Sequence, residues 1–146
     1  MHAYSEMEIT GSIVIVDDDD DDHYILRRVC EKIGVAVPIV FFTDARNALE
    51  YLRTAKERPF LILSDVNMPV VNGLELKRQI DADPELKRKA VPFVFFSTSA
   101  MTQVVRDAFD MSVHGFFIKG QNLDDLEDTL RIIFEYWSRC EKPRAI

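Results

Sequence analysis

Short apolar runs alternate with helical patterns along the chain, and this alternation limits the possible folds more than any other feature. Each run is rich in β-branched or aromatic residues and is followed by a polar residue. Apolar runs of four or five residues without strict alternation are typical of strands that are buried on both faces. The runs cover residues 12–16, 38–42, 60–63, 92–96 and 115–118.

Between and after these runs, apolar residues recur at the spacing of amphipathic helices. Gly34 predicts the end of the first helix, and Thr43 or Asp44 is expected to cap the second. The third should end at the segment 83–84, since proline disfavours helical backbone before it. The five apolar stripes are Leu26, Val29, Cys30 and Ile33; Ala45, Ala48, Leu49 and Leu52; Leu76 and Ile80; Met101, Val104, Val105 and Ala108; and Leu123, Leu126, Leu130, Ile133 and Trp137.

Five strand–helix units in succession predict an α/β fold. Right-handed crossovers would place helices on both faces of a five-stranded parallel sheet, which gives a three-layer sandwich. We expect one domain over residues 11–138, with an N-terminal tail over 1–10 and a C-terminal tail over 139–146.

The composition narrows the function classes. Hydrophobic residues make up 47% and charged residues 29%, which is typical of a globular protein. A net charge of -7 disfavours binding to a nucleic-acid backbone. The chain has no signal-peptide core and no run of membrane-spanning length, and Cys30 and Cys140 fit no zinc or redox spacing. We therefore expect a cytoplasmic protein that binds neither nucleic acid nor membrane.

Polar residues stand where four of the predicted strands end. Asp17 and Asp18 follow the first strand, Asp65 follows the third, Ser97 the fourth and Lys119 the fifth. In an open parallel sheet, ligands bind at this edge. Clustered carboxylates require a cation, and oxygen ligands suit Mg²⁺. A carboxylate beside Mg²⁺ can attack phosphorus, while the metal and the lysine spread the charge of the phosphoryl group and the serine hydroxyl bonds one of its oxygens.

At these positions the chain resembles the receiver domains of two-component response regulators. The matching segments are 13–18, 63–69, Gly73, 91–98 and 115–119, and the resemblance extends from about residue 12 to 137. It implies a flavodoxin-like (βα)5 fold with strand order 2-1-3-4-5. Segments 80–88, 97–99 and 136–137 are also similar to the single-domain, phytochrome-associated subfamily.

The resemblance implies a phosphoacceptor and a metal site. Asp65 would accept the phosphoryl group, and Lys119 would contact it. Mg²⁺ would be bound by Asp17, Asp18, Asp65 and the backbone carbonyl of Asn67.

The resemblance also implies a conformational switch made of Ser97 and Phe116. Asn67 and Ser99 would set the rate of self-dephosphorylation, which is a property of the switch rather than an enzyme activity. On sequence grounds alone, an ordinary core residue is an equally good interpretation of Phe116.

The partners follow from the same resemblance. A sensor histidine kinase or a histidine phosphotransfer protein would supply phosphate, and a downstream protein target or a phosphorelay would receive the signal. Members of the subfamily often form homodimers through the face made by the last helix, strand and helix. Ile132 and Tyr136 fall off the apolar stripe of the last helix, as expected for residues facing a partner.

The chain departs from the family pattern at Gly120, where most members carry a proline after a cis peptide bond. A cis bond before glycine costs about 3 kcal/mol, so a trans bond and a less rigidly held Lys119 are open alternatives. This departure leaves room for a second interpretation, a pseudo-receiver that serves only as an interaction module. A third, an aspartyl-phosphate phosphohydrolase, is disfavoured because Asn67 stands where such enzymes carry a general acid.

Two further motifs have plainer interpretations. Residues 17–22 are six consecutive aspartates, and we expect Asp19 to Asp22 only to cap the first helix and complement its dipole. An EF-hand is excluded because its glycine and glutamate positions are occupied by Asp22 and Arg28. Ser97 or Thr98 is expected to cap the fourth helix.

Overall fold

The computed structural model describes residues 11–68, 70–98, 100–120 and 122–141. Strands and helices alternate as predicted, with one additional short helix, α5. In chain order the elements are β1 (Ile13–Val16), α2 (Asp20–Ile33), β2 (Ile39–Phe42), α3 (Ala45–Thr54), β3 (Leu61–Ser64), α4 (Gly73–Ala82), α5 (Pro84–Lys89), β4 (Phe93–Ser97), α6 (Thr102–Asp110), β5 (Gly115–Ile118) and α7 (Leu123–Arg139).

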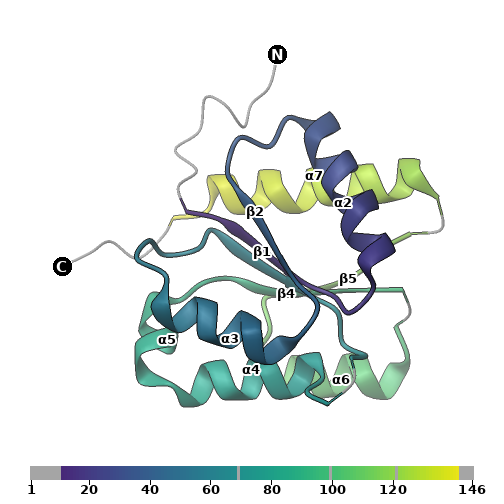
Figure 1. The fold of residues 1–146 in the computed structure, drawn as a ribbon. Helices are drawn as coiled ribbons and strands as arrows, with labels where there is room; N and C mark the ends of the chain where they lie inside the picture. Colours follow the sequence, from purple (N-terminus) through teal and green to yellow (C-terminus); the bar gives the residue numbers. More distant parts are fainter. Residues whose placement is uncertain (1–10, 69, 99, 121, 142–146) are drawn as a thin grey trace.

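The five strands form one parallel sheet in the order β2-β1-β3-β4-β5, which confirms the predicted topology. Helices α2 and α7 cover one face, and α3, α4, α5 and α6 cover the other (Figure 1). Within the described ranges, no helix is both long and apolar enough to cross a membrane.

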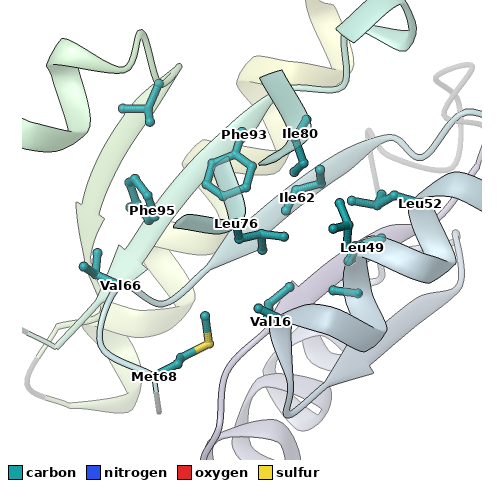
Figure 2. Packing of buried hydrophobic residues seen from close by; sticks show 14 of the residues in the cluster. Val16, Leu49, Leu52, Ile62, Val66, Met68, Leu76, Ile80, Phe93 and Phe95 are labelled. Atoms are coloured by element: carbon teal, nitrogen blue, oxygen red, sulfur yellow. The ribbon is translucent and has the colours of Figure 1, made fainter. Parts of the chain in front are cut away.

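The central strands are buried on both faces because successive side chains point to opposite sides of the sheet. In β1, Ile13 and Ile15 pack in the core under α2 and α7, whereas Val14 and Val16 pack in the core under α3 and α4. Figure 2 shows this second core, in which Val16 lies with side chains from β3, β4, α3 and α4. All residues of β1, β3 and β4 are buried, while the edge strands β2 and β5 are only partly covered.

Capping side chains explain most helix boundaries. Asp44 caps α3 by accepting from the backbone N–H of Arg46 at 2.7 Å. Asp83 ends α4 and at once caps α5, where Pro84 occupies the first turn. The prediction that Ser97 or Thr98 caps α6 was wrong, because Ser97 remains in β4 and α6 begins after Met101, whose side chain cannot cap it.

Candidate functional site

Three carboxylates meet at the carboxyl edge of the sheet. Val16 and Ser64 lie opposite each other at the ends of the neighbouring strands β1 and β3, so Asp17 and Asp65 emerge side by side. Oxygen atoms of Asp17, Asp18 and Asp65 all lie within 4.8 Å of one another. Asp17 is buried, Asp65 is partly buried and Asp18 is exposed. The group is therefore open to solvent on one side, as a site for an exchangeable ligand must be.

Lys119 reaches this group from the end of β5. Its Nζ atom lies 2.5 Å from Oδ2 of Asp17 and 3.8 Å from Oδ2 of Asp65. The same atom lies 2.8 Å from Oδ2 of Asp22 in the first turn of α2. The structure thus brings together the acidic and basic strand-end residues that the sequence predicts to converge.

Burial and charge pairing oppose each other at this site. Burial raises the pKa of Asp17, although hydrogen bonds from Lys119 and from the backbone of Asp19 act against it. Burial disfavours the charge of Lys119, but its hydrogen bonds to Asp17 and Asp22 outweigh this effect and raise its pKa. The ammonium is therefore held charged between the acids.

Asp22 lies in the first turn of α2, as expected, and it makes a further contact that the sequence did not predict. Asp19 does cap α2, because its Oδ1 accepts from the backbone N–H of Asp21 at 2.9 Å. Asp22 instead points to Lys119. Asp18 precedes the N-cap residue of α2, so helical spacing does not relate it to Asp22, and the contact of Asp22 with Lys119 depends on how α2 lies in the fold.

Backbone geometry fixes Asp65 beside the start of α4. Its Oδ1 accepts from the N–H of Val66 at 2.7 Å, so Oδ2 is the oxygen on the lysine side. Gly73 packs directly on its backbone: a Cβ atom there would lie 2.2 Å from the carbonyl oxygen of Asp65 and 2.8 Å from Cε1 of Phe95. Only glycine fits this approach, which gives the Gly73 of the motif a physical reason.

The loop after β1 is held by two further bonds. Oδ1 of Asp17 accepts from the N–H of Asp19 at 3.0 Å, and Nε2 of His23 lies 2.5 Å from the Asp17 carbonyl oxygen. The His23 ring also packs against Phe41 on β2, with ring centroids 4.8 Å apart. His23, which the sequence left without a role, thus ties the acidic loop to the edge of the sheet.

The peptide bond between Lys119 and Gly120 is trans, as is every other bond between described residues. The backbone N–H of Lys119 donates to the carbonyl of Ser97 at 2.8 Å. Gly120 has a φ of +95° and packs so tightly on α7 that a Cβ would lie 2.6 Å from Cβ of Asp125. This turn positions the backbone of Lys119 without the proline of the common family pattern.

The two predicted switch residues lie on the β4–β5 side of the site. Ser97 is the last residue of β4, is buried, and pairs in register with Ile118. Phe116 is partly buried and packs against Phe95, with ring centroids 5.8 Å apart. Asn67 is exposed next to the acidic group. Ser99 lies outside the described residues.

The chemistry of the donors fits a hard divalent cation. The three clustered side chains offer only oxygen ligands, and one of them is exposed, which leaves room for bound water. The ammonium of Lys119 contacts the carboxylates of Asp17, Asp22 and Asp65, and the exposed Asp18 adds a fourth negative charge to the group. The residual negative charge favours a cation at this site.

Comparison with known proteins gives a consistent result. Residues 13–131 match the sequence model of the response regulator receiver domain. The chain is 32% identical to the probable methanogenesis regulatory protein FilR2 of Methanothrix harundinacea over 77% of its length and 74% of the relative. It is 31% identical to response regulator Rcp1 of Synechocystis over 68% of its length and 69% of the relative.

Two solved structures extend this likeness to the fold. The phosphorylated cyanobacterial phytochrome response regulator RcpA superposes with a TM-score of 0.82 and 30% identity, over 93% of this chain and all of the other. The Mn²⁺-bound form of Rcp1 superposes with a TM-score of 0.79 and 26% identity, over 92% of this chain and all of the other.

Proposed function

This chain belongs to the response regulator receiver family, and we propose that it is a signalling switch in which Asp65 accepts a phosphoryl group from a phosphohistidine. The donor is a sensor histidine kinase or a histidine phosphotransfer protein. The observation that carries this proposal is the meeting of Asp17, Asp18 and Asp65 with the ammonium of Lys119 at the carboxyl edge of the sheet.

The transfer follows from the bonds at Asp65. Its Oδ1 is engaged by the N–H of Val66, so Oδ2 attacks the phosphorus. A new O–P bond forms, the N–P bond of the donor breaks, and the imidazole keeps the electron pair. The product is an acyl phosphate on Asp65. Lys119, 3.8 Å from the attacking oxygen, is placed to pair with the phosphoryl oxygens.

Mg²⁺ would be held by Asp17, Asp18, Asp65 and the backbone carbonyl of Asn67. When bound, it supplies positive charge that offsets the charge on the phosphoryl oxygens. The fit of oxygen donors to a divalent cation supports this assignment. The Mn²⁺-bound form of Rcp1 is a related protein with a divalent metal.

The signal would leave through the β4–β5 side. In this proposal the hydroxyl of Ser97 donates a hydrogen bond to a phosphoryl oxygen, and Phe116 becomes more deeply buried. These changes shift the equilibrium between two conformations of α6, β5 and α7. Output is by contact with a downstream protein or by a phosphorelay in the cytoplasm. Ile132 and Tyr136 on α7 are exposed and would face a partner, including a second copy of the chain.

The switch is not proposed to turn over a substrate. The acyl phosphate hydrolyses on the protein itself, and the side chains of Asn67 and Ser99 set its lifetime.

Labelling with acetyl phosphate tests the proposal. The wild-type chain should gain one phosphoryl group in the presence of Mg²⁺ and none in excess EDTA. Asp65→Asn should not be labelled, whereas Asp21→Asn, a change at an exposed neighbour of the site, should be labelled like the wild type. Equal labelling of Asp65→Asn would refute the assignment.

Assays with other phosphodonors and with a simple phosphate ester separate the alternatives. Failure to accept phosphate from any donor would favour the interaction module, and rapid hydrolysis of a simple phosphate ester would favour the phosphohydrolase.

A further inference from the structure

Asp22 contacts Lys119 from outside the group of clustered acids. Its Oδ2 lies 2.8 Å from Nζ of Lys119, yet it is not one of the three residues whose oxygens gather within 4.8 Å. The side chain of Asp22 is 30% exposed and that of Lys119 is 9% exposed. The pair is therefore shielded from water on the lysine side, unlike the fully exposed ion pairs that contribute little.

Lys119 and a bound cation would compete for the carboxylate of Asp17. The shortest contact of Lys119 is to Asp17, which is also a candidate metal ligand. An oxygen of Asp17 that binds a cation accepts a weaker hydrogen bond from the ammonium. The four-carbon stem of lysine is flexible, so the ammonium competes with the cation for Asp17 unless another acceptor holds it. Asp22 is that acceptor, because an ammonium has three donors and can bond both carboxylates at once.

The backbone around Lys119 does not by itself fix the position of the ammonium. Gly120 has a positive φ and a close fit against α7, so the turn fixes where the lysine begins but not where its ammonium ends. The ammonium is located only by its contacts with Asp17, Asp22 and Asp65. Of these three, Asp22 alone stands apart from the cluster that would bind a cation.

We propose that Asp22 is a positioning residue that retains the ammonium of Lys119 beside the clustered acids while Asp17 binds a divalent cation. This inference rests on the proposed function, because it assumes that the clustered acids take up such a cation. It deepens that function by assigning to α2 a part in preparing the site, although none of its residues is a candidate ligand.

A titration with MgCl₂ tests the proposal directly. Binding is monitored by NMR through the backbone amide resonances of Asp18 and Val66. Asp22→Ala should weaken Mg²⁺ binding about tenfold, at the lower end of what outer partners of metal ligands contribute. Without Asp22 the lysine competes with the cation for Asp17. Asp21→Ala removes the same charge from the same helical turn and should change the affinity by no more than about twofold, since its carboxylate is exposed and screened.

Two further readouts separate positioning from a general charge effect. In a Lys119→Met background, Asp22→Ala should weaken Mg²⁺ binding no more than Asp21→Ala does, because no ammonium remains to be held. In metal-free buffer, the side-chain ammonium signal of Lys119 should be visible by NMR in the wild type and in Asp21→Ala. It should be lost through faster proton exchange in Asp22→Ala.

The outcomes are distinguishable from failure of the proposed function. If the wild-type chain binds no Mg²⁺, the proposed function is refuted together with its site. If the wild type binds Mg²⁺ but Asp22→Ala matches Asp21→Ala, or if the effect of Asp22→Ala persists without Lys119, only the positioning role of Asp22 is overturned.

Discussion

The paired strands β1 and β3 on one side and the edge strand β5 with helix α6 on the other differ in how deeply they are buried. On the first side, both strands are fully buried and their terminal acids already contact the lysine that would assist the chemistry. On the second side, β5 is a partly exposed edge strand, and α6 has a single fully buried residue, Ala108. Met101, Phe109 and Ile118 are exposed large apolar residues in the same region.

This difference matches the two tasks of a switch. Phosphoryl transfer requires groups held in place before the reaction, whereas signalling requires a segment that can change its packing at low cost. In the proposed function, the first task would fall mainly to the acids at the ends of buried strands and the second to the sheet edge. Each prediction below would sharpen or break this division.

The largest contrast is expected between the truncation of a buried side chain in β3 and that of a half-exposed side chain in β5. Leu63→Ala in β3 removes a fully buried side chain and should lower the free energy of unfolding by about 2–5 kcal/mol. Ile118→Ala in β5 removes a side chain that is 49% exposed and should change it by about 0.5 kcal/mol or less. Urea denaturation of both variants measures the contrast, and similar losses would show that the two sides are equally well packed.

Native-state hydrogen exchange should show the same division without mutation. Amides of α6 and β5 should exchange at least about tenfold faster than those of β1 and β3, because they are covered by fewer buried side chains. Phosphorylation should alter exchange mainly in α6 and β5. Uniform exchange, or a change confined to β1 and β3, would contradict the division.

Gly120→Ala tests the turn between β5 and α7, which follows Lys119. Alanine at a φ of +95°, with its Cβ 2.6 Å from Cβ of Asp125, should destabilise the fold by about 1–3 kcal/mol and slow labelling by displacing Lys119. The matched control is Gly34→Ala, which also has a positive φ, at the end of α2. It should lower stability but leave the labelling rate unchanged; equal rates for both variants would show that the turn does not position the lysine.

The smallest effect concerns repulsion within the acidic group. Asp18→Asn should raise the stability of the metal-free protein by about 1 kcal/mol, because it removes one of three crowded negative charges. The same change should abolish the stabilisation by Mg²⁺, which in the wild type reaches about 1.4 kcal/mol at ten times the dissociation constant. Thermal unfolding with and without Mg²⁺ measures both effects, and a loss of stability without metal would argue against crowding.

The residues that sequence reasoning placed correctly are those whose position follows from the ends of strands. Asp17, Asp65 and Lys119 converge because parallel strands share one carboxyl edge, and that edge can be identified from the pattern of apolar runs. The strand order, by contrast, came from the resemblance to a family and is confirmed by the observed sheet.

The sequence was less informative where the answer depends on packing between elements. Asp22 looks like any aspartate of a helix terminus until the fold brings its side chain to Lys119, which follows β5. The cap of α6 was assigned to the wrong residues because the length of β4 is set by pairing with β5. Gly73 and Gly120 are explained only by their close contacts with Asp65 and Asp125 in the folded chain. Local conformational propensity does not predict these contacts.

The most direct test of the central claim is to locate the phosphoryl group on the chain. After labelling with acetyl phosphate and Mg²⁺, borohydride reduction converts an aspartyl phosphate into homoserine, which mass spectrometry of peptides can assign to one position. The account predicts homoserine at Asp65 alone. Homoserine at Asp17 or Asp18 instead, or at no aspartate in a chain that is demonstrably labelled, would contradict it.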